Sequence, residues 1–262
     1  APRRMRRALH AEWTKLRTTS GPAWLLGAAV VLTIGLGAAV VASTTFAPED
    51  AVQDTTKLSL TGVDAGQAVV AVLAVMLVSS EYSTGLVRIT LTAVPRRWVV
   101  LLSKASLLAG LSLLAGAVGT LASLLVGQAI LPGHGFTAAH GYAAVSLSHG
   151  PTLRAAVGSV LYLALVALMS LGIATAIRDT ATSMGTVLGL LYVFPLVATF
   201  IGNPAWHRHV EQIGPMSAGL AIQSTIGLSS LPLSPWSGVG VMVAWAAGSL
   251  ILGGLLLQFR DA

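Results

Sequence analysis

Residues 79–98, with the sequence SSEYSTGLVRITLTAVPRRW, form a polar and basic segment between two long apolar runs. Apolar side chains recur in it at helical spacing, which predicts an amphipathic helix: Tyr82, Leu86, Ile89 and Ala93. Pro95 ends this helix, because proline disfavours the helical conformation at the residue before it. Two interpretations follow: a surface on which a water-soluble partner docks, or a loop that anchors the next apolar run at the lipid headgroups.

The composition places most of the chain in a membrane. Of its 262 residues, 55% are hydrophobic and 9% are charged, whereas soluble domains carry roughly 25% charge. We therefore expect one transmembrane domain over residues 1–262. The chain has no cysteine, which excludes disulfides and thiolate chemistry. Its basic residues lie beside the apolar runs instead of forming a polar domain, so we expect the lipid bilayer, and no nucleic acid, as a partner.

Six apolar runs have the length of about 20 residues that crosses the hydrocarbon core. They cover residues 22–43, 63–80, 102–131, 152–177, 181–201 and 238–259. The second run is marginal, because Asp64 and Gln67 lie near one end of it. The expected fold is an all-α polytopic membrane protein with six transmembrane helices.

The positive charges predict how these spans are oriented. Of the 15 lysines and arginines, only Lys57, Arg154 and Arg208 fall on one side of the six spans. Because basic residues concentrate in the cytoplasm, we expect both termini and residues 81–97 to be cytoplasmic. This makes residues 81–97 a cytoplasmic helix between spans two and three, and residues 202–236 an outer loop.

The N-terminal segment, residues 2–20, is also amphipathic and predicts an interfacial elbow helix that lies along the membrane surface. Four of its residues are candidates for this role: Glu12, Trp13, Lys15 and Arg17. A generic basic flank is the alternative. A cleaved signal peptide is less favoured, because the basic region extends to Arg17 and the apolar run exceeds a typical signal core.

The chain lacks the residues that two common ways of driving transport require, namely ion coupling and ATP hydrolysis. No ionisable residue falls at the centre of a span, which weighs against an ion-coupled carrier and against a charged channel. A P-loop needs a lysine that follows glycine, but Lys15, Lys57 and Lys104 follow threonine or serine. We therefore expect no nucleotide-binding or catalytic site in this chain.

Other candidate features are weaker. His207, His209 and Glu211 are metal-ligand types without a recognised spacing, so polar loop residues are the favoured interpretation and no metal site is expected. Ser217 has no histidine within a span to activate it as a protease nucleophile. Residues 215–231 predict a re-entrant segment in the outer loop or, alternatively, a buried loop helix.

Span five contains a GxxxG pair, Gly185 and Gly189. Small residues at this spacing let two helices approach closely. The pair therefore predicts either packing within the chain or contact with a second subunit.

The chain resembles the permease subunits of ABC-2 type exporters, especially compact six-span permeases of actinobacteria. The resemblance rests on AEWTKLRTT at residues 11–19, on the Glu-Tyr-x-x-Gly pattern followed by Pro-Arg-Arg within residues 79–98, and on the order of the elements. It implies a bacterial plasma membrane protein, paired with a second permease as a homodimer or a related heterodimer. A separate cytoplasmic ABC ATPase would bind ATP and Mg²⁺, so that this chain itself needs no cofactor.

The resemblance also implies which residues face the ATPase. The coupling helix supplies these candidates: Glu81, Tyr82, Gly85, Arg88, Arg96 and Arg97. Ser83 and Thr84 depart from the family, in which charged residues often occupy these positions. The substrate is expected to be lipophilic or amphipathic and to move outward, and no residue is assigned to it. A non-pumping binding, resistance or sensory subunit is the alternative function, and an ion-coupled transporter is a third.

Overall fold

The computed structural model describes residues 9–15, 18–47, 52–83 and 97–259, and every regular element within them is helical. The long helices are α2 (Ser20–Ser43), α4 (Val63–Ser83), α6 (Arg97–Ile130), α7 (Gly150–Ile177), α8 (Thr180–Phe200) and α11 (Pro235–Phe259). The short elements are α3 (Thr55–Leu60), η1 (Leu131–His134), η2 (Ala138–His140), α9 (Pro204–Ile213), α10 (Pro215–Leu220), η3 (Ala221–Gln223) and η4 (Leu228–Ser230). Residues 9–15 are helical as well.

Six helices are long and apolar enough to cross a membrane, as predicted. The chain is thus an all-helical protein with the architecture of a multi-pass membrane protein. The second span is longer than expected, because α3 precedes α4 and together they cover Thr55–Tyr82. Gln67 does not interrupt it. Its side chain is fully buried, and its oxygen accepts a hydrogen bond from the Tyr162 hydroxyl of α7, which offsets part of the cost of burying an amide. Its Nε2 has no hydrogen-bond partner among the described residues.

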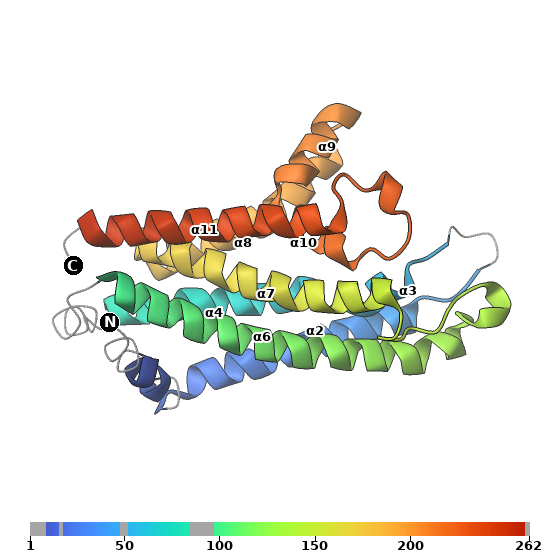
Figure 1. Cartoon of the computed structure of the whole chain (residues 1–262), viewed down its shortest axis with the longest axis horizontal. Coiled ribbons are helices and arrows are strands. Elements are labelled where there is room, and N and C mark those ends of the chain that lie inside the picture. The colour runs from blue at the N-terminus through green and yellow to red at the C-terminus, as the bar shows by residue number, and fades with distance from the viewer. Residues whose placement is uncertain (1–8, 16–17, 48–51, 84–96, 260–262) are drawn as a thin grey trace.

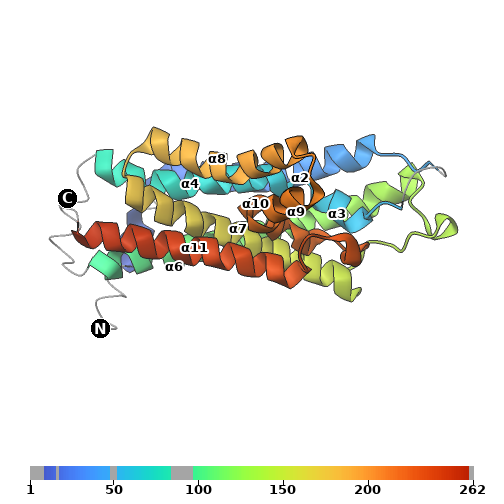
Figure 2. The same ribbon diagram turned by 90° about the horizontal axis from the view of Figure 1, so that it is seen from above.

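The long helices lie side by side along one axis, as Figures 1 and 2 show. Helix α7 is central and packs against α4, α6, α8 and α11. Residues 9–15, the end of α4 and the start of α6 lie at one end of the bundle, which we call the basic end (Figure 1). The loops that contain η1, η2 and η4 lie at the other end, which we call the loop end (Figure 1).

Large apolar side chains cover the outer faces of the bundle. Val31 on α2, Leu114 on α6 and Ile251 on α11 are each more than half exposed. Exposed apolar surface on this scale is costly in water and is expected where helices contact lipid. The outward faces therefore agree with the composition in assigning the six long helices to a bilayer.

Glycine allows the first two spans to approach closely. A Cβ atom on Gly62, between α3 and α4, would lie 1.8 Å from the backbone oxygen of Thr33 on α2. No side chain fits in this space, so the contact requires glycine. Such backbone contacts replace the hydrophobic driving force that is missing between helices in lipid.

At the loop end, residues 215–224 enter the bundle between α7 and α11. Gly219 of α10 contacts the ring of Tyr162, and Ile222 contacts Gly158. Tyr162 lies twelve residues after the start of α7, or about 18 Å along the helix axis. The segment is therefore a buried helical turn that enters from the loop end and returns to it, which combines the two interpretations offered by the sequence. Helix α9 points away from the bundle (Figure 1).

Two charged residues hold the end of this segment. Asp54, which caps α3, accepts hydrogen bonds from the backbone nitrogens of Thr225 and Ile226 and from the Thr225 hydroxyl, the last at 2.7 Å. The Arg154 guanidinium of α7 donates to the backbone oxygen of Ser224 at 2.5 Å. These contacts fix the segment to α3 and α7.

Candidate functional site

Four charged side chains meet at the basic end, and we call them the four-charge cluster: Glu12, Lys15, Glu81 and Lys104. The Lys104 Nζ lies 2.8 Å from Glu12 Oε2 and 2.6 Å from Glu81 Oε1. The Lys15 Nζ lies 2.8 Å from Glu81 Oε1 and 3.1 Å from Glu12 Oε1. Each carboxylate thus contacts both ammonium groups, and the four formal charges cancel.

Three separate elements position these side chains. Glu12 and Lys15 lie one turn apart on the helix of residues 9–15, so both face the same side. Glu81 lies in the last turn of α4, and Lys104 lies two turns into α6. The cluster therefore joins the N-terminal helix to the ends of spans two and three.

The cluster is largely shielded from solvent. The side chains of Glu12, Glu81 and Lys104 are 6%, 9% and 6% exposed, whereas that of Lys15 is 40% exposed. Burying an ion costs several kcal/mol, so these charges persist only because each has oppositely charged partners. Loss of one member leaves another buried charge uncompensated, which makes the geometry of the three elements interdependent.

Lys15 keeps its charge in this setting. Partial burial lowers the pKa of its ammonium, but the hydrogen bond to Glu81 and the charges of Glu12 and Glu81 outweigh burial. The net result is a pKa above the ordinary value for lysine. Lys15 is therefore a cation at every physiological pH.

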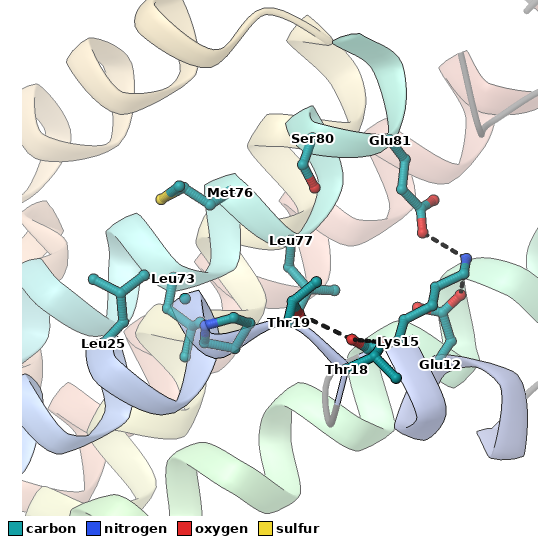
Figure 3. A pocket seen from close by; sticks show the side chains of 12 residues that line it. Glu12, Lys15, Thr18, Thr19, Leu25, Leu73, Met76, Leu77, Ser80 and Glu81 are labelled. Atoms are coloured by element: carbon teal, nitrogen blue, oxygen red, sulfur yellow. Dashed lines mark hydrogen bonds and ion pairs between the residues drawn. The ribbon is translucent and has the colours of Figure 1, made fainter. Parts of the chain in front are cut away.

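An apolar cavity of about 450 Å³ adjoins the cluster, and Figure 3 shows the side chains around it. Leu25 of α2 and Leu73, Met76 and Leu77 of α4 form its apolar part. The polar part consists of Glu12, Lys15, Thr18, Thr19, Ser80 and Glu81. The cavity thus has an apolar body and a charged end.

Arginines at the same end bind the last turn of α11. The Arg97 guanidinium donates to the backbone oxygens of Leu257 and Gln258, and the Arg178 guanidinium donates to that of Leu256 at 3.2 Å. The terminal carbonyls of a helix lack partners within it and carry partial negative charge, so they favour such cations. Arg178 also lies 5.4 Å from the centre of the Tyr82 ring.

The structure describes three of the six predicted coupling residues. Glu81, Tyr82 and Arg97 belong to the ends of α4 and α6 and contact other parts of the chain. Gly85, Arg88 and Arg96 lie outside the described residues, as does most of the predicted helix 81–97. A direct role of these six residues in binding an ATPase stays a prediction.

The predicted elbow residues separate into two groups. Glu12 and Lys15 belong to the four-charge cluster, and Trp13 is 42% exposed. Arg17 lies outside the described residues. The sequence did not indicate that Glu12 and Glu81 share Lys104. Glu12 and Lys104, for example, are 92 positions apart in the chain. The one available signal was a lysine placed two turns inside an otherwise apolar helix.

Gly185 and Gly189 lie on an open face of α8. A Cβ atom on either glycine would meet no atom within 4 Å among those described. The pair therefore does not mediate close packing within the described part of the chain, and contact with a second subunit stays a prediction.

The histidine pattern on α9 does not converge on one point. His207 Nε2 lies 3.4 Å from Glu211 Oε2, whereas His209 Nδ1 lies 3.3 Å from Gln212 Oε1. Within the described ranges, no three histidine or acidic side chains are grouped as metal ligands. The Ser217 hydroxyl donates to the backbone oxygen of Glu211, which makes it a loop contact.

A second cavity, of about 340 Å³, opens at the loop end. It is more polar and lies between the start of α4 and residues 211–233. Its charged lining consists of Lys57, Asp64 and Glu211, with Gln223 and Ser217 nearby. Two polar regions thus lie at opposite ends of the bundle.

No protein-family model matches this sequence, and no curated protein matches it significantly. The fold and the site define an all-helical protein with six membrane-capable spans and a charge cluster at one end.

Proposed function

We propose that this chain is the membrane subunit of an ATP-driven exporter, and that a separate cytoplasmic ATPase binds ATP and Mg²⁺. The resemblance of residues 11–19 and 79–98 to ABC-2 permeases motivates the proposal. The observation that supports it best is the four-charge cluster. It ties the N-terminal helix to both helices that flank residues 84–96, and these are the elements expected to contact the motor.

The cluster suits the transmission of movement. Residues 84–96 connect α4 to α6 in the sequence, so a force applied to them acts on both helices. Packed elements move as rigid units, and paired buried ions resist separation. Closure of an ATPase pair would therefore shift residues 9–15, α4 and α6 together instead of deforming one loop.

The proposal assigns an orientation and partners. The basic end faces the cytoplasm of a bacterial cell, in agreement with the positive-inside rule. A second permease, identical or related, completes the pathway, and a lipophilic or amphipathic substrate moves outward. Antibiotic resistance by efflux is one role that such a protein can have.

Co-purification tests the proposal. The chain is coexpressed with the ABC ATPase encoded beside it and is purified through a tag on the chain alone. We expect a complex whose ATP hydrolysis responds to substrate in lipid. We expect Arg88→Glu to abolish the complex, and Glu81→Gln to preserve the complex but lower transport per ATP hydrolysed.

Asp179→Asn is the matched control for these variants. Asp179 lies at the same end and caps α8 outside the cluster, and asparagine caps helices equally well. Failure to co-purify, together with normal function of Glu81→Gln, would refute the proposal. Binding of substrate without any effect on hydrolysis would favour a non-pumping subunit, and uptake driven by a pH gradient without nucleotide would favour an ion-coupled carrier.

A further inference from the structure

The cavity at the loop end has no role in the proposed coupling to an ATPase. Its volume of about 340 Å³ falls within the range of ligand pockets. Leu220, Leu231 and Leu233 form much of its apolar wall, and Asp64 and Gln223 belong to its polar wall. A ligand that matches this lining combines an apolar body with a polar group.

Asp64 lies inside the second span and not at its edge. Because α3 extends the span to Thr55, Asp64 is nine residues from the start of the span, or about 13 Å along a helix axis. It is also close enough to Tyr162 on α7 and Tyr192 on α8 to interact with both electrostatically. An ionisable side chain at this depth is costly and indicates a functional site.

The Asp64 carboxylate is not paired within the described part of the chain. The Tyr192 hydroxyl donates to the backbone oxygen of Asp64 at 2.5 Å, and no described residue forms a hydrogen bond or an ion pair with the carboxylate. Lys57 attracts Asp64 electrostatically, but no ion pair joins the two. The carboxylate is therefore able to accept hydrogen bonds from a ligand.

Gln223 supplies a second acceptor on the cavity wall. Its side chain is 2% exposed, and its Nε2 donates to Ser159 Oγ at 3.1 Å. No described residue donates to its amide oxygen. Since buried polar groups normally have a hydrogen-bond partner, this oxygen suits a ligand that brings an N–H or O–H donor.

The charges on the cavity wall favour a cation. Asp64 and Glu211 line the cavity together with Lys57, so two carboxylates share it with one ammonium group. Glu211 contacts His207 at 3.4 Å, and Lys57 is ion-paired with neither carboxylate among the residues described. With histidine counted as neutral, the wall carries one net negative charge, which attracts a cation and repels an anion.

We propose that this cavity binds a primary amine with an apolar body. The ammonium group donates to the Asp64 carboxylate and to the Gln223 oxygen, and the apolar body lies against Leu231 and Leu233. An ammonium group has three donors and no acceptor, which matches this pair of acceptors. The inference rests on the proposed function for the role of the ligand, which is that of an exported substrate.

Isothermal titration calorimetry tests the site on the full-length chain in phosphatidylcholine nanodiscs, with empty nanodiscs as the blank. Three probes share one carbon skeleton: phenylbutylamine, phenylbutanol and phenylbutanoate. We expect the amine to bind more tightly than the alcohol, and the carboxylate to bind most weakly. Equal binding of the amine and the alcohol, or tighter binding of the carboxylate, would refute the proposal.

Two charge variants test the polar part. Asp64→Asn keeps the size of the side chain but removes its charge, so it should weaken amine binding by at least about tenfold, as expected for a hydrogen bond to a charged group. Lys57→Gln removes a like charge and should strengthen amine binding, an effect that a damaged fold does not produce. Asp179→Asn, at the basic end, is the matched control and should bind as the wild type does. Wild-type affinity in Asp64→Asn, or weaker binding in Lys57→Gln, would contradict the site.

A pair of tryptophan variants tests the apolar part. Leu231→Trp fills the cavity and should reduce binding of the amine and of the alcohol. Leu228→Trp, at a position that is 40% exposed and outside the cavity lining, should leave binding unchanged. The proposal is wrong if the two variants behave alike.

ATP hydrolysis by the co-purified complex separates the site from its role. If the amine binds the chain alone but does not stimulate hydrolysis, the site is correct and its role in export is wrong. If the complex exports another substrate at the cost of ATP while the chain binds no amine, the site is wrong and the proposed function stands.

Discussion

The Lys104 ammonium lies 2.6 Å from a carboxylate oxygen of Glu81, although the two residues belong to different spans and both side chains are almost fully buried. This pair fixes the spacing between the end of α4 and the second turn of α6. The segment that connects those helices in the sequence is the one that we propose docks an ATPase. The ion pair therefore connects a local sequence motif to the geometry of the bundle.

Replacement of Lys104 should strongly destabilise the folded protein. In Lys104→Met, the carboxylates of Glu12 and Glu81 keep only Lys15 as an ionic partner in the cluster. Breaking a buried pair by removing one partner costs about 3–5 kcal/mol, so the unfolding temperature in detergent should fall sharply. Adding Glu81→Gln to Lys104→Met should recover part of the loss, and Lys57→Met, at an exposed lysine, should have little effect. Equal effects of Lys104→Met and Lys57→Met would contradict the burial of the cluster.

The glycine between α3 and α4 should tolerate no side chain. Gly62→Ala places a methyl group 1.8 Å from the Thr33 oxygen of α2, and the two helices must separate to accept it. Overpacking of this kind costs about 1–3 kcal/mol. Gly189→Ala meets no atom within 4 Å and should be neutral or slightly stabilising in the monomer, because alanine favours the helix. Thermal unfolding of the two variants in detergent measures the difference. An unchanged unfolding temperature for Gly62→Ala would show that Gly62 does not lie this close to the Thr33 oxygen.

The open face of α8 should contact a second subunit. Because the chain has no cysteine, Gly189→Cys introduces a single thiol, and mild oxidation in membranes should produce a cross-linked dimer. Leu114→Cys, on the exposed face of α6, is the control and should cross-link weakly. Equal cross-linking at both positions would point to random collision instead of a defined interface. Gel electrophoresis without reducing agent measures the result.

Asp54 should hold the end of the buried segment in place at the loop end. Asp54→Ala removes the hydrogen bonds accepted from Thr225 and Ile226 as well as the cap of α3. Hydrogen bonds to a charged group contribute about 1.5–3 kcal/mol, so residues 224–228 should exchange their amide hydrogens much faster. Asp54→Asn should show a smaller effect, because it retains one accepting oxygen. Unchanged exchange in Asp54→Ala would mean that Arg154 and the packing of α10 hold the segment without Asp54.

The sequence by itself determined the six spans. The length of an apolar run decides whether it can cross a bilayer, and this property is local. Five of the expected spans therefore end within five residues of the observed helices on both sides. The second span was underestimated at its start, because α3 (Thr55–Leu60), which precedes the apolar run, is polar and contains Lys57. Only the tertiary structure provides the burial site and the Tyr162 partner that accommodate Gln67.

Which glycines permit close packing, and which charges meet, depended on the tertiary structure. Gly62 and Gly189 are chemically identical, yet one lies against a backbone oxygen and the other on an open face, because the crossing of the helices decides what each meets. Glu12 and Lys104 are 92 residues apart, and no local pattern relates them. Their contact exists because the bundle brings the N-terminal helix beside α6. The sequence thus indicated a charged segment at the membrane surface, and the fold decided that Glu81 in it binds two lysines of the same chain.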